Sequence, residues 1–288
     1  MIWLWCTRAS WALLPVTTGA AFADATEGWS IGPSRLAALF LWVTWSVGLF
    51  TLFAPRPWGL TLLRVVAPCG FACVAVSSAS TTSLESAGLA LASSGVAAIL
   101  ALSAPTALAA ANAHAYGDEQ RFPLRIPMPL LFGPIPVAVA LVVLGFVSGP
   151  LLLADGRYLT GALATVVGVP VALLVVRALH SLSCRWFVLV PAGIAIADPL
   201  TLTEPVLVRR EHIARLRRTA TAALPPDALD LRLGTIAGGI LMGLSEPVEF
   251  GRRRGRGNAD VVAPQLLAAA VVRADAAIGQ ARTRRISA

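Results

Sequence analysis

Lysine is absent from this 288-residue chain, and all 23 of its basic residues are arginine. Charged residues of both signs make up only 13% of the sequence, against about 25% in a typical soluble domain. Hydrophobic residues make up 57%. This shortage of charge excludes an ordinary soluble protein, because the chain must place much of its surface in lipid.

Several motifs of catalytic and cofactor sites are also missing. The sequence has no His-Glu-x-x-His, no phosphate-binding glycine loop that ends in lysine and no Cys-x-x-Cys pair. Cys69 and Cys73 lie four residues apart in an apolar stretch, where they can act as small packing residues. Cys6 and Cys184 are isolated, so no disulfide framework is predicted. We therefore expect a non-enzymatic protein that has no cofactor.

Six long apolar stretches fill the first 180 residues, and about 20 apolar residues suffice for a helix to cross a membrane. The predicted spans are residues 36–54, 61–80, 86–112, 134–154 and 158–180, with a further stretch near 9–28. Pro68, Pro105 and Pro170 lie inside spans and predict local kinks rather than breaks, because neighbouring helices can satisfy the freed carbonyls. The fold class is a bundle of five or six transmembrane helices.

The first 23 residues leave three alternatives open. Residues 1–23 can be a retained span, a signal peptide cleaved after Ala21-Phe22-Ala23, or the product of a mis-assigned start codon. Arg8 follows an apolar opening, whereas a signal peptide should begin with its basic region, and this order favours a retained span.

The arginines near the span ends predict the orientation. Arginines of short loops concentrate on the cytoplasmic side of a membrane. One set of loops and span ends holds Arg8, Arg56, Arg64, Arg121, Arg125, Arg177 and Arg185, and the opposite set holds only Arg35 and Arg157. The sequence therefore predicts a bacterial plasma-membrane protein with a cytoplasmic C-terminus and a cytoplasmic loop at 113–128.

The middle of the spans contains no Asp, Glu or His. Ion-coupled transporters and pumps need ionisable groups at this depth, so the sequence counts against that class. Gly88, Ala92 and Gly95 share one face of the span at 86–112 and predict close helix packing there.

From residue 181 the sequence changes character, because 15 of the 23 arginines and 9 of the 15 acids follow. Short strand-like runs appear at 186–190, 193–197, 205–208, 229–233, 240–244 and 248–250, separated by turn residues. Apolar residues then recur at helical spacing from Val262 to Ala281, with Asp260 as a possible cap ahead of Pro264. We predict a small β-rich domain at 181–288 that ends in a helix.

This order resembles bacterial pleckstrin-homology-like (PH-like) domains that follow transmembrane helices. The likeness rests on three runs: Arg185-Trp186-Phe187-Val188-Leu189, Gly193-Ile194-Ala195-Ile196 and Arg209-Arg210-Glu211-His212-Ile213. The whole chain is also similar to uncharacterised multi-pass membrane proteins of actinobacteria. It departs from the common PH-like arrangement, in which one helical hairpin precedes the domain.

The loop at 113–128 is the densest polar cluster of the first 180 residues. His114, Asp118 and Glu119 could bind a divalent cation together with His180, and a haem between His114 and His180 is another alternative. We favour a third, in which His114, Asp118, Glu119 and Arg121 dock the loop against the tail domain and an acid pairs with its arginines.

Two arginine clusters stand out in the tail. The first contains Arg209, Arg210, Arg215, Arg217 and Arg218, and the second contains Arg252, Arg253, Arg254 and Arg256. Arginines near a membrane surface are attracted to anionic headgroups, and no aromatic platform for nucleic acid interleaves with them. We therefore expect the tail to face anionic lipid of the inner leaflet or an envelope-associated protein, and not nucleic acid. The alternative is a transporter or channel subunit with a regulatory tail.

Overall fold

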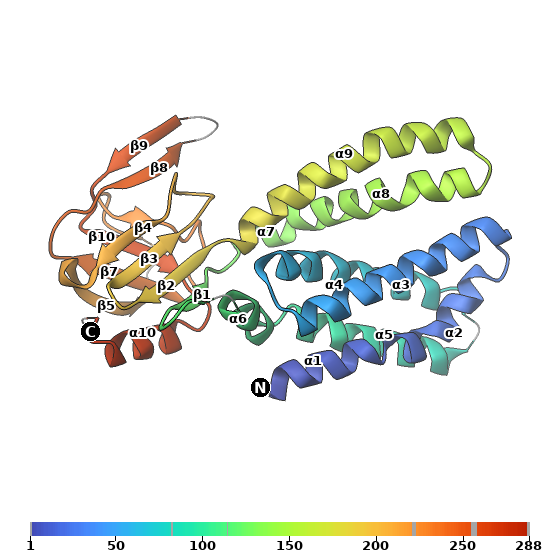
Figure 1. The fold of residues 1–288 in the computed structure, drawn as a ribbon, viewed down its shortest axis with the longest axis horizontal. Helices are drawn as coiled ribbons and strands as arrows, with labels where there is room; N and C mark the ends of the chain where they lie inside the picture. The colour runs from blue at the N-terminus through green and yellow to red at the C-terminus, as the bar shows by residue number, and fades with distance from the viewer. Residues whose placement is uncertain (1, 82, 114, 221–222, 255–257, 287–288) are drawn as a thin grey trace. The chain divides into compact units, whose positions relative to one another are not determined.

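A computed structural model describes residues 2–81, 83–113, 115–220, 223–254 and 258–286 (Figure 1). The chain forms two compact units. The first comprises residues 1–110 and 136–179, and the second comprises residues 111–135 and 180–288. Each unit is described by itself below.

The first unit is helical. Its helices are α1 (Ile2–Ala12), α2 (Leu14–Thr26), α3 (Ile31–Phe53), α4 (Pro57–Ser78), α5 (Leu84–Ala101), α6 (Ala104–Asn112), α8 (Pro134–Ala154) and α9 (Tyr158–Ser183). Five of them, α3, α4, α5, α8 and α9, are long and apolar enough to cross a membrane. The chain is therefore built as a multi-pass membrane protein, as predicted from the apolar stretches.

The stretch near 9–28 does not form one long helix. A bend at Leu13 separates α1 from α2, because Pro15 lacks the N–H that a continuous helix would need there. The two helices still follow each other in series, since the N–H groups of Val16 and Thr17 both donate to the Leu13 carbonyl. Helix α1 packs against α3 and α5, and α2 packs against α4 and α5.

The predicted span at 86–112 is wrong in its second half. Helix α5 ends at Ala101 and α6 begins at Ala104, so Pro105 lies in the first turn of a new helix rather than kinking a continuous one. The hydroxyls of Ser103 and Thr106 both donate to the Leu100 carbonyl, at 2.6 and 2.9 Å, beside the Ser103 N–H that donates to the same oxygen at 3.2 Å. Helices α4 and α9 do continue through Pro68 and Pro170, as predicted.

The packed face of α5 also differs from the prediction. Gly88 and Ala92 are exposed, and the residues buried from α5 are Ala90, Ser94, Ala97, Ala98 and Ala101. Alanines on this face let α1, α2 and α4 approach closely. The glycine spacing alone did not distinguish the packed face from the exposed one, because small residues occur on both.

Helices α8 and α9 form a hairpin that is packed through glycines. A Cβ added at Gly145 would lie 2.4 Å from the Gly168 carbonyl oxygen, and one added at Gly149 would lie 2.1 Å from Thr165 Oγ1. Only residues without a side chain permit this separation between two helix backbones.

Gly145→Leu is therefore expected to destabilise the hairpin. The added side chain would meet the backbone of α9, and overpacking of this kind costs about 1–3 kcal/mol or more. The apparent Tm of the detergent-solubilised protein should fall by several degrees. Gly88→Leu is the matched control, because a Cβ there meets nothing within 4 Å; equal melting of the two variants would contradict the close packing.

Among the described residues, the second unit contains ten strands and two short helices with a 3-10 turn. They are β1 (Gln120–Pro123), α7 (Met128–Phe132), β2 (Trp186–Val190), β3 (Gly193–Ala197), β4 (Val206–Arg209), η1 (Arg210–His212), β5 (Ile213–Thr219), β6 (Leu229–Asp230), β7 (Gly239–Leu244), β8 (Phe250–Arg254), β9 (Asn258–Val262), β10 (Leu266–Ala270) and α10 (Ala274–Thr283). One sheet has the order β1-β2-β3-β4, a second has the order β5-β7-β10-β6, and β8 and β9 form a separate pair (Figure 1).

Both faces of the first sheet are covered at its centre. Phe187, Leu189 and Ile194 are fully buried, and the alternate residues Trp186 and Val188 form a second cluster with Ala111 at the end of α6. The side chains on both faces of strand β2 are thus buried. This explains why its sequence is continuously apolar and does not alternate between apolar and polar residues.

The predicted terminal helix from Val262 to Ala281 is wrong in its first half. Residues 266–270 form β10, which lies between β7 and β6, and only 274–283 form a helix. Four of the five residues of β10 are buried, so this strand shows no alternation that would distinguish it from a helix. Asp260 lies in β9 rather than at a helix cap.

Candidate functional site

A buried ion pair fixes the point where the chain passes from α9 into the first sheet. The Arg185 guanidinium donates to both carboxylate oxygens of Asp198 at 2.7 Å, and the two side chains are 1% and 0% exposed. Arg185 also donates to the carbonyl oxygens of Arg125 (2.9 Å) and Leu231 (3.2 Å). One side chain thus joins β2, the turn after β3, the segment after β1 and the segment after β6.

This pair was missed by the sequence reasoning, which used Arg185 to infer orientation and as the first residue of a PH-like run. The signal was present, because Arg185 immediately precedes an apolar strand and Asp198 immediately follows the next one. Trp186 pairs with Ala197 across β2 and β3, so the antiparallel register brings residues 185 and 198 opposite each other.

The hairpin of β8 and β9, called here the arginine hairpin (residues 250–262), is attached to the turn after β3. The N–H of Arg253 donates to the Thr201 carbonyl and the N–H of Thr203 donates to the Gly251 carbonyl, each at 2.8 Å. The Arg253 guanidinium donates to the Leu202 carbonyl. The N–H of Leu202 in turn donates to the Asp198 carbonyl, so the hairpin is linked to the buried pair.

The arginine hairpin carries a net positive charge. It contains four arginines and one acid, Asp260. Arg254 Nε lies 2.7 Å from Asp260 Oδ2, and Arg252 has no side-chain partner among the described residues. Arg256, predicted as part of this cluster, lies outside the described residues.

The other arginine cluster is partly neutralised. Arg218 Nη1 lies 2.5 Å from Asp275 of α10, and Arg209 Nη1 lies 3.5 Å from Glu211. Arg210, Arg215 and Arg217 are exposed, and within the described ranges their side chains have no hydrogen-bond or ion-pair partner.

The structure does not bring the two clusters into one surface. Strand β5, which carries Arg215, Arg217 and Arg218, lies beside α10, whereas the arginine hairpin extends from the opposite end of the second unit (Figure 1). The two clusters therefore act as separate charged regions.

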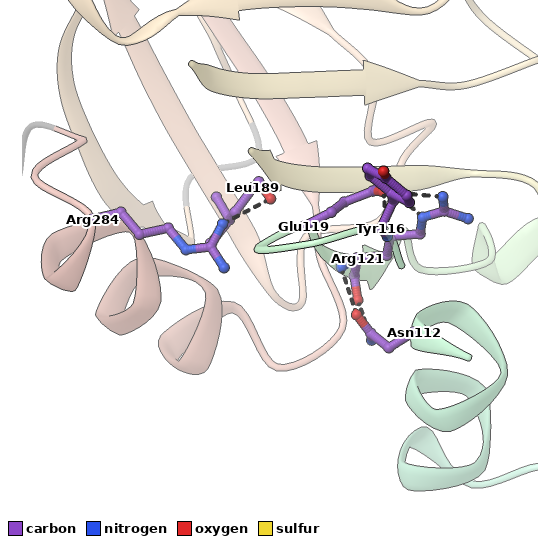
Figure 2. A network of polar contacts seen from close by, with 6 residues as sticks. All are labelled: Asn112, Tyr116, Glu119, Arg121, Leu189 and Arg284. Atoms are coloured by element: carbon purple, nitrogen blue, oxygen red, sulfur yellow. Dashed lines mark hydrogen bonds and ion pairs between the residues drawn. The ribbon is translucent and has the colours of Figure 1, made fainter. Parts of the chain in front are cut away.

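The predicted cytoplasmic loop contributes strand β1 to the first sheet. Gln120–Pro123 pairs antiparallel with β2. The Asn112 side chain makes two 2.8 Å hydrogen bonds with the backbone of Arg121, donating to its carbonyl and accepting from its N–H (Figure 2). The compact unit that holds the tail thus includes residues 111–135 as well as those after 180.

Two charged residues of this loop, Glu119 and Arg121, pair with each other rather than with residues of the tail. Arg121 Nε lies 2.7 Å from Glu119 Oε1 (Figure 2). Hydrogen bonding from Arg121 holds the pKa of Glu119 below its usual value. Asp118 is exposed and has no partner in the described part of the chain, and His114 lies outside the described residues.

From the tail side, Arg284 just after α10 donates to the Leu189 carbonyl at 2.9 Å (Figure 2). Leu189 pairs with Gln120 across β1 and β2, so the end of the terminal helix is fastened beside the strand from the loop.

The residues proposed as ligands do not assemble a metal site in the part of the chain that the structure describes. No group of three His, Cys, Asp or Glu side chains comes together among those residues. His180 Nε2 instead lies 3.4 Å from Cys184 Sγ, and burial raises the pKa of this thiol. The ligand set with His114 is outside this test, because His114 is not described.

One catalytic-looking motif was overlooked in the sequence. Residues 28–32 read Gly-Trp-Ser-Ile-Gly, the spacing of a nucleophile elbow. Such an elbow places its serine on a turn between a strand and a helix. Ser30 instead begins α3 after a short turn from α2, so the geometry does not support a nucleophile here.

No protein family, curated protein or solved structure matches this chain. The functional argument therefore rests on the chain's own residues.

Proposed function

We propose that the chain is an integral protein of the bacterial plasma membrane that holds a basic β-rich unit against anionic lipid of the inner leaflet. The observation that carries the proposal is the anchoring of the arginine hairpin. Its contacts run through residues 201–203 to Asp198 and Arg185, and Arg185 comes two residues after the end of α9. The hairpin is thus linked through these contacts to the residue that precedes β2, the first strand after α9.

The orientation rests on the arginine distribution and on the helix count. Residues 2–26 form α1 and α2 in series, and 25 residues at 1.5 Å rise extend about 37 Å, more than the ~30 Å of hydrocarbon. We infer that the two helices cross the membrane together. Six crossings would place Ile2 and the tail on the same side, where arginines are frequent, as the cytoplasmic side requires.

The element order of the second unit supports a PH-like fold. Two four-stranded sheets are followed by α10, which packs against β2 and β5. The chain adds a parallel pair of β10 with β6 and the separate arginine hairpin. A β-rich body of this kind supplies a rigid base for a charged hairpin.

We take the arginine hairpin rather than the cluster around β5 as the lipid contact because its backbone is attached to the turn after β3. Each basic residue near an anionic surface contributes about 1 kcal/mol, so an attached hairpin with a net charge of three is held firmly. The cluster around β5 has the same net charge, because Arg218 and Arg209 of its five arginines are paired with acids, so attachment and not charge distinguishes the two.

Fluorescence quenching tests the proposal, because it reports how closely the arginine hairpin approaches lipid headgroups. A fluorophore is attached to Ala259→Cys in the full chain, after the four native cysteines are replaced, and the protein is placed in nanodiscs that contain headgroup-spin-labelled lipid. We expect strong quenching with 30% phosphatidylglycerol. The quenching should weaken in 1 M salt, because the Debye length falls from ~10 Å at 0.1 M to ~3 Å.

Two variants serve as matched controls. Replacing Arg252, Arg254 and Arg256 by Gln should reduce quenching to the level of neutral phosphatidylcholine nanodiscs, with Arg253 kept because it anchors the hairpin. Replacing Arg215 and Arg217 by Gln should leave the quenching unchanged. If the hairpin variant were quenched as strongly as the unsubstituted chain, lipid contact through these arginines would be ruled out.

A further inference from the structure

Helices α2, α3 and α4 line a partly open apolar cavity of about 160 Å³ within the first unit. It begins beside the bend at Leu13, because Trp11 and Leu14 on either side of that bend both line it. Before the bend, α1 packs against α3, and after it α2 packs against α4 and α5. The cavity lies where α2 and α3 face each other, since residues of both helices line it.

The cavity walls are regular faces of helices rather than loops. The lining residues recur at spacings of three and four, namely Pro15, Thr18 and Phe22 on α2 and Ala38, Trp42 and Trp45 on α3. The base comes from α4, whose lining residues extend from Val66 to Ser77 and include Gly70. Packing of the apolar helices thus fixes the shape of the cavity.

The lining offers little to a polar ligand. Among the described residues that line it, none is charged. The indole N–H groups of Trp11 and Trp45 each donate to the other's carbonyl at 2.9 Å. Thr18 and Ser94 donate to carbonyls of their own helices, Leu14 and Ala90. A ligand that bound here would gain chiefly from burial of its apolar surface.

The dimensions match part of one lipid chain. Engineered apolar cavities of about 150 Å³ stay dry and bind benzene-sized molecules. The α4 residues of the lining extend along about 16 Å of helix, roughly half of the ~30 Å hydrocarbon thickness. They lie in the half of α4 that leads to the turn before α5. The cavity therefore faces the chains of a single leaflet.

We propose that this cavity binds a hydrocarbon chain of a membrane lipid. The site lies between helices that are surrounded by lipid, so chains are the ligand present at highest concentration. Gly19 and Gly70 keep the space open, because a Cβ added at either position meets nothing within 4 Å. Gly70→Leu would therefore fill the cavity without a backbone clash.

The test uses photo-crosslinking in nanodiscs of phosphatidylcholine that carries a diazirine in one acyl chain. In the unsubstituted chain, we expect crosslinks to peptides that contain Phe22, Trp42 and Val74. Gly70→Leu should reduce them about tenfold, which corresponds to the loss of two buried methylene groups. Gly88→Leu adds the same side chain to an exposed position of α5 and should leave labelling unchanged.

Two further measurements keep the result decisive. Gly19→Leu fills the cavity from α2 and should reduce labelling if Gly70→Leu does not fold. Phosphatidylcholine with the diazirine on its headgroup should not label these peptides. Equal labelling of Gly70→Leu and Gly88→Leu, or labelling spread evenly over all lipid-facing helices, would overturn the proposal.

Discussion

Arg185→Met is expected to open the β-rich unit. The substitution leaves the Asp198 carboxylate buried without its partner, and breaking a buried pair in this way costs about 3–5 kcal/mol. It also removes the donor to the carbonyls of Arg125 and Leu231. Hydrogen–deuterium exchange in β2 and β3 should accelerate by about two to three orders of magnitude, since each factor of ten corresponds to ~1.4 kcal/mol.

Arg209→Met provides the control for this prediction. Arg209 Nη1 lies 3.5 Å from Oε1 of Glu211, and both side chains are exposed. A surface pair of this kind contributes about 0–1 kcal/mol, so the rate of hydrogen–deuterium exchange should change little. The double variant Arg185→Met with Asp198→Leu should recover part of the loss, because no lone charge remains buried. If Arg185→Met exchanged like Arg209→Met, the buried pair would not be the element that joins these segments.

The apolar helices could be predicted because membrane crossing requires little beyond length and composition. Helix α8 has the bounds that the sequence predicts, Pro134–Ala154. The break before α6 could not be predicted from Pro105 alone. At the break, the hydroxyls of Ser103 and Thr106 and the Ser103 N–H all donate to the carbonyl of Leu100.

Two strands, β10 and β1, show why the local sequence pattern does not predict the strands of a buried sheet. β10 (Leu266–Ala270) fits a helical period as well as a strand, and only its place between β7 and β6 determines the outcome. β1 (Gln120–Pro123) has four residues in a polar loop, and it becomes a strand because the edge of β2 is available to pair with it. Such non-local pairing leaves almost no signal in a single sequence.

The sequence predicted which charged residues the candidate site contains, but not how they are arranged in space. Both arginine clusters are evident in the sequence, yet their separation depends on which strands pair. Similarly, Glu119 finds its partner two residues away in Arg121, whereas the sequence interpretation favoured an arginine in the tail.

The orientation of the chain is the central claim, and cysteine accessibility tests it most directly. Single cysteines are placed at Ile2, Asp155 or Ala259 in a chain without its native cysteines, and intact cells are treated with an impermeant maleimide. We predict labelling of Asp155→Cys in intact cells, and labelling of Ile2→Cys and Ala259→Cys only after permeabilisation. Labelling of Ala259→Cys in intact cells, with Asp155→Cys protected, would contradict the account.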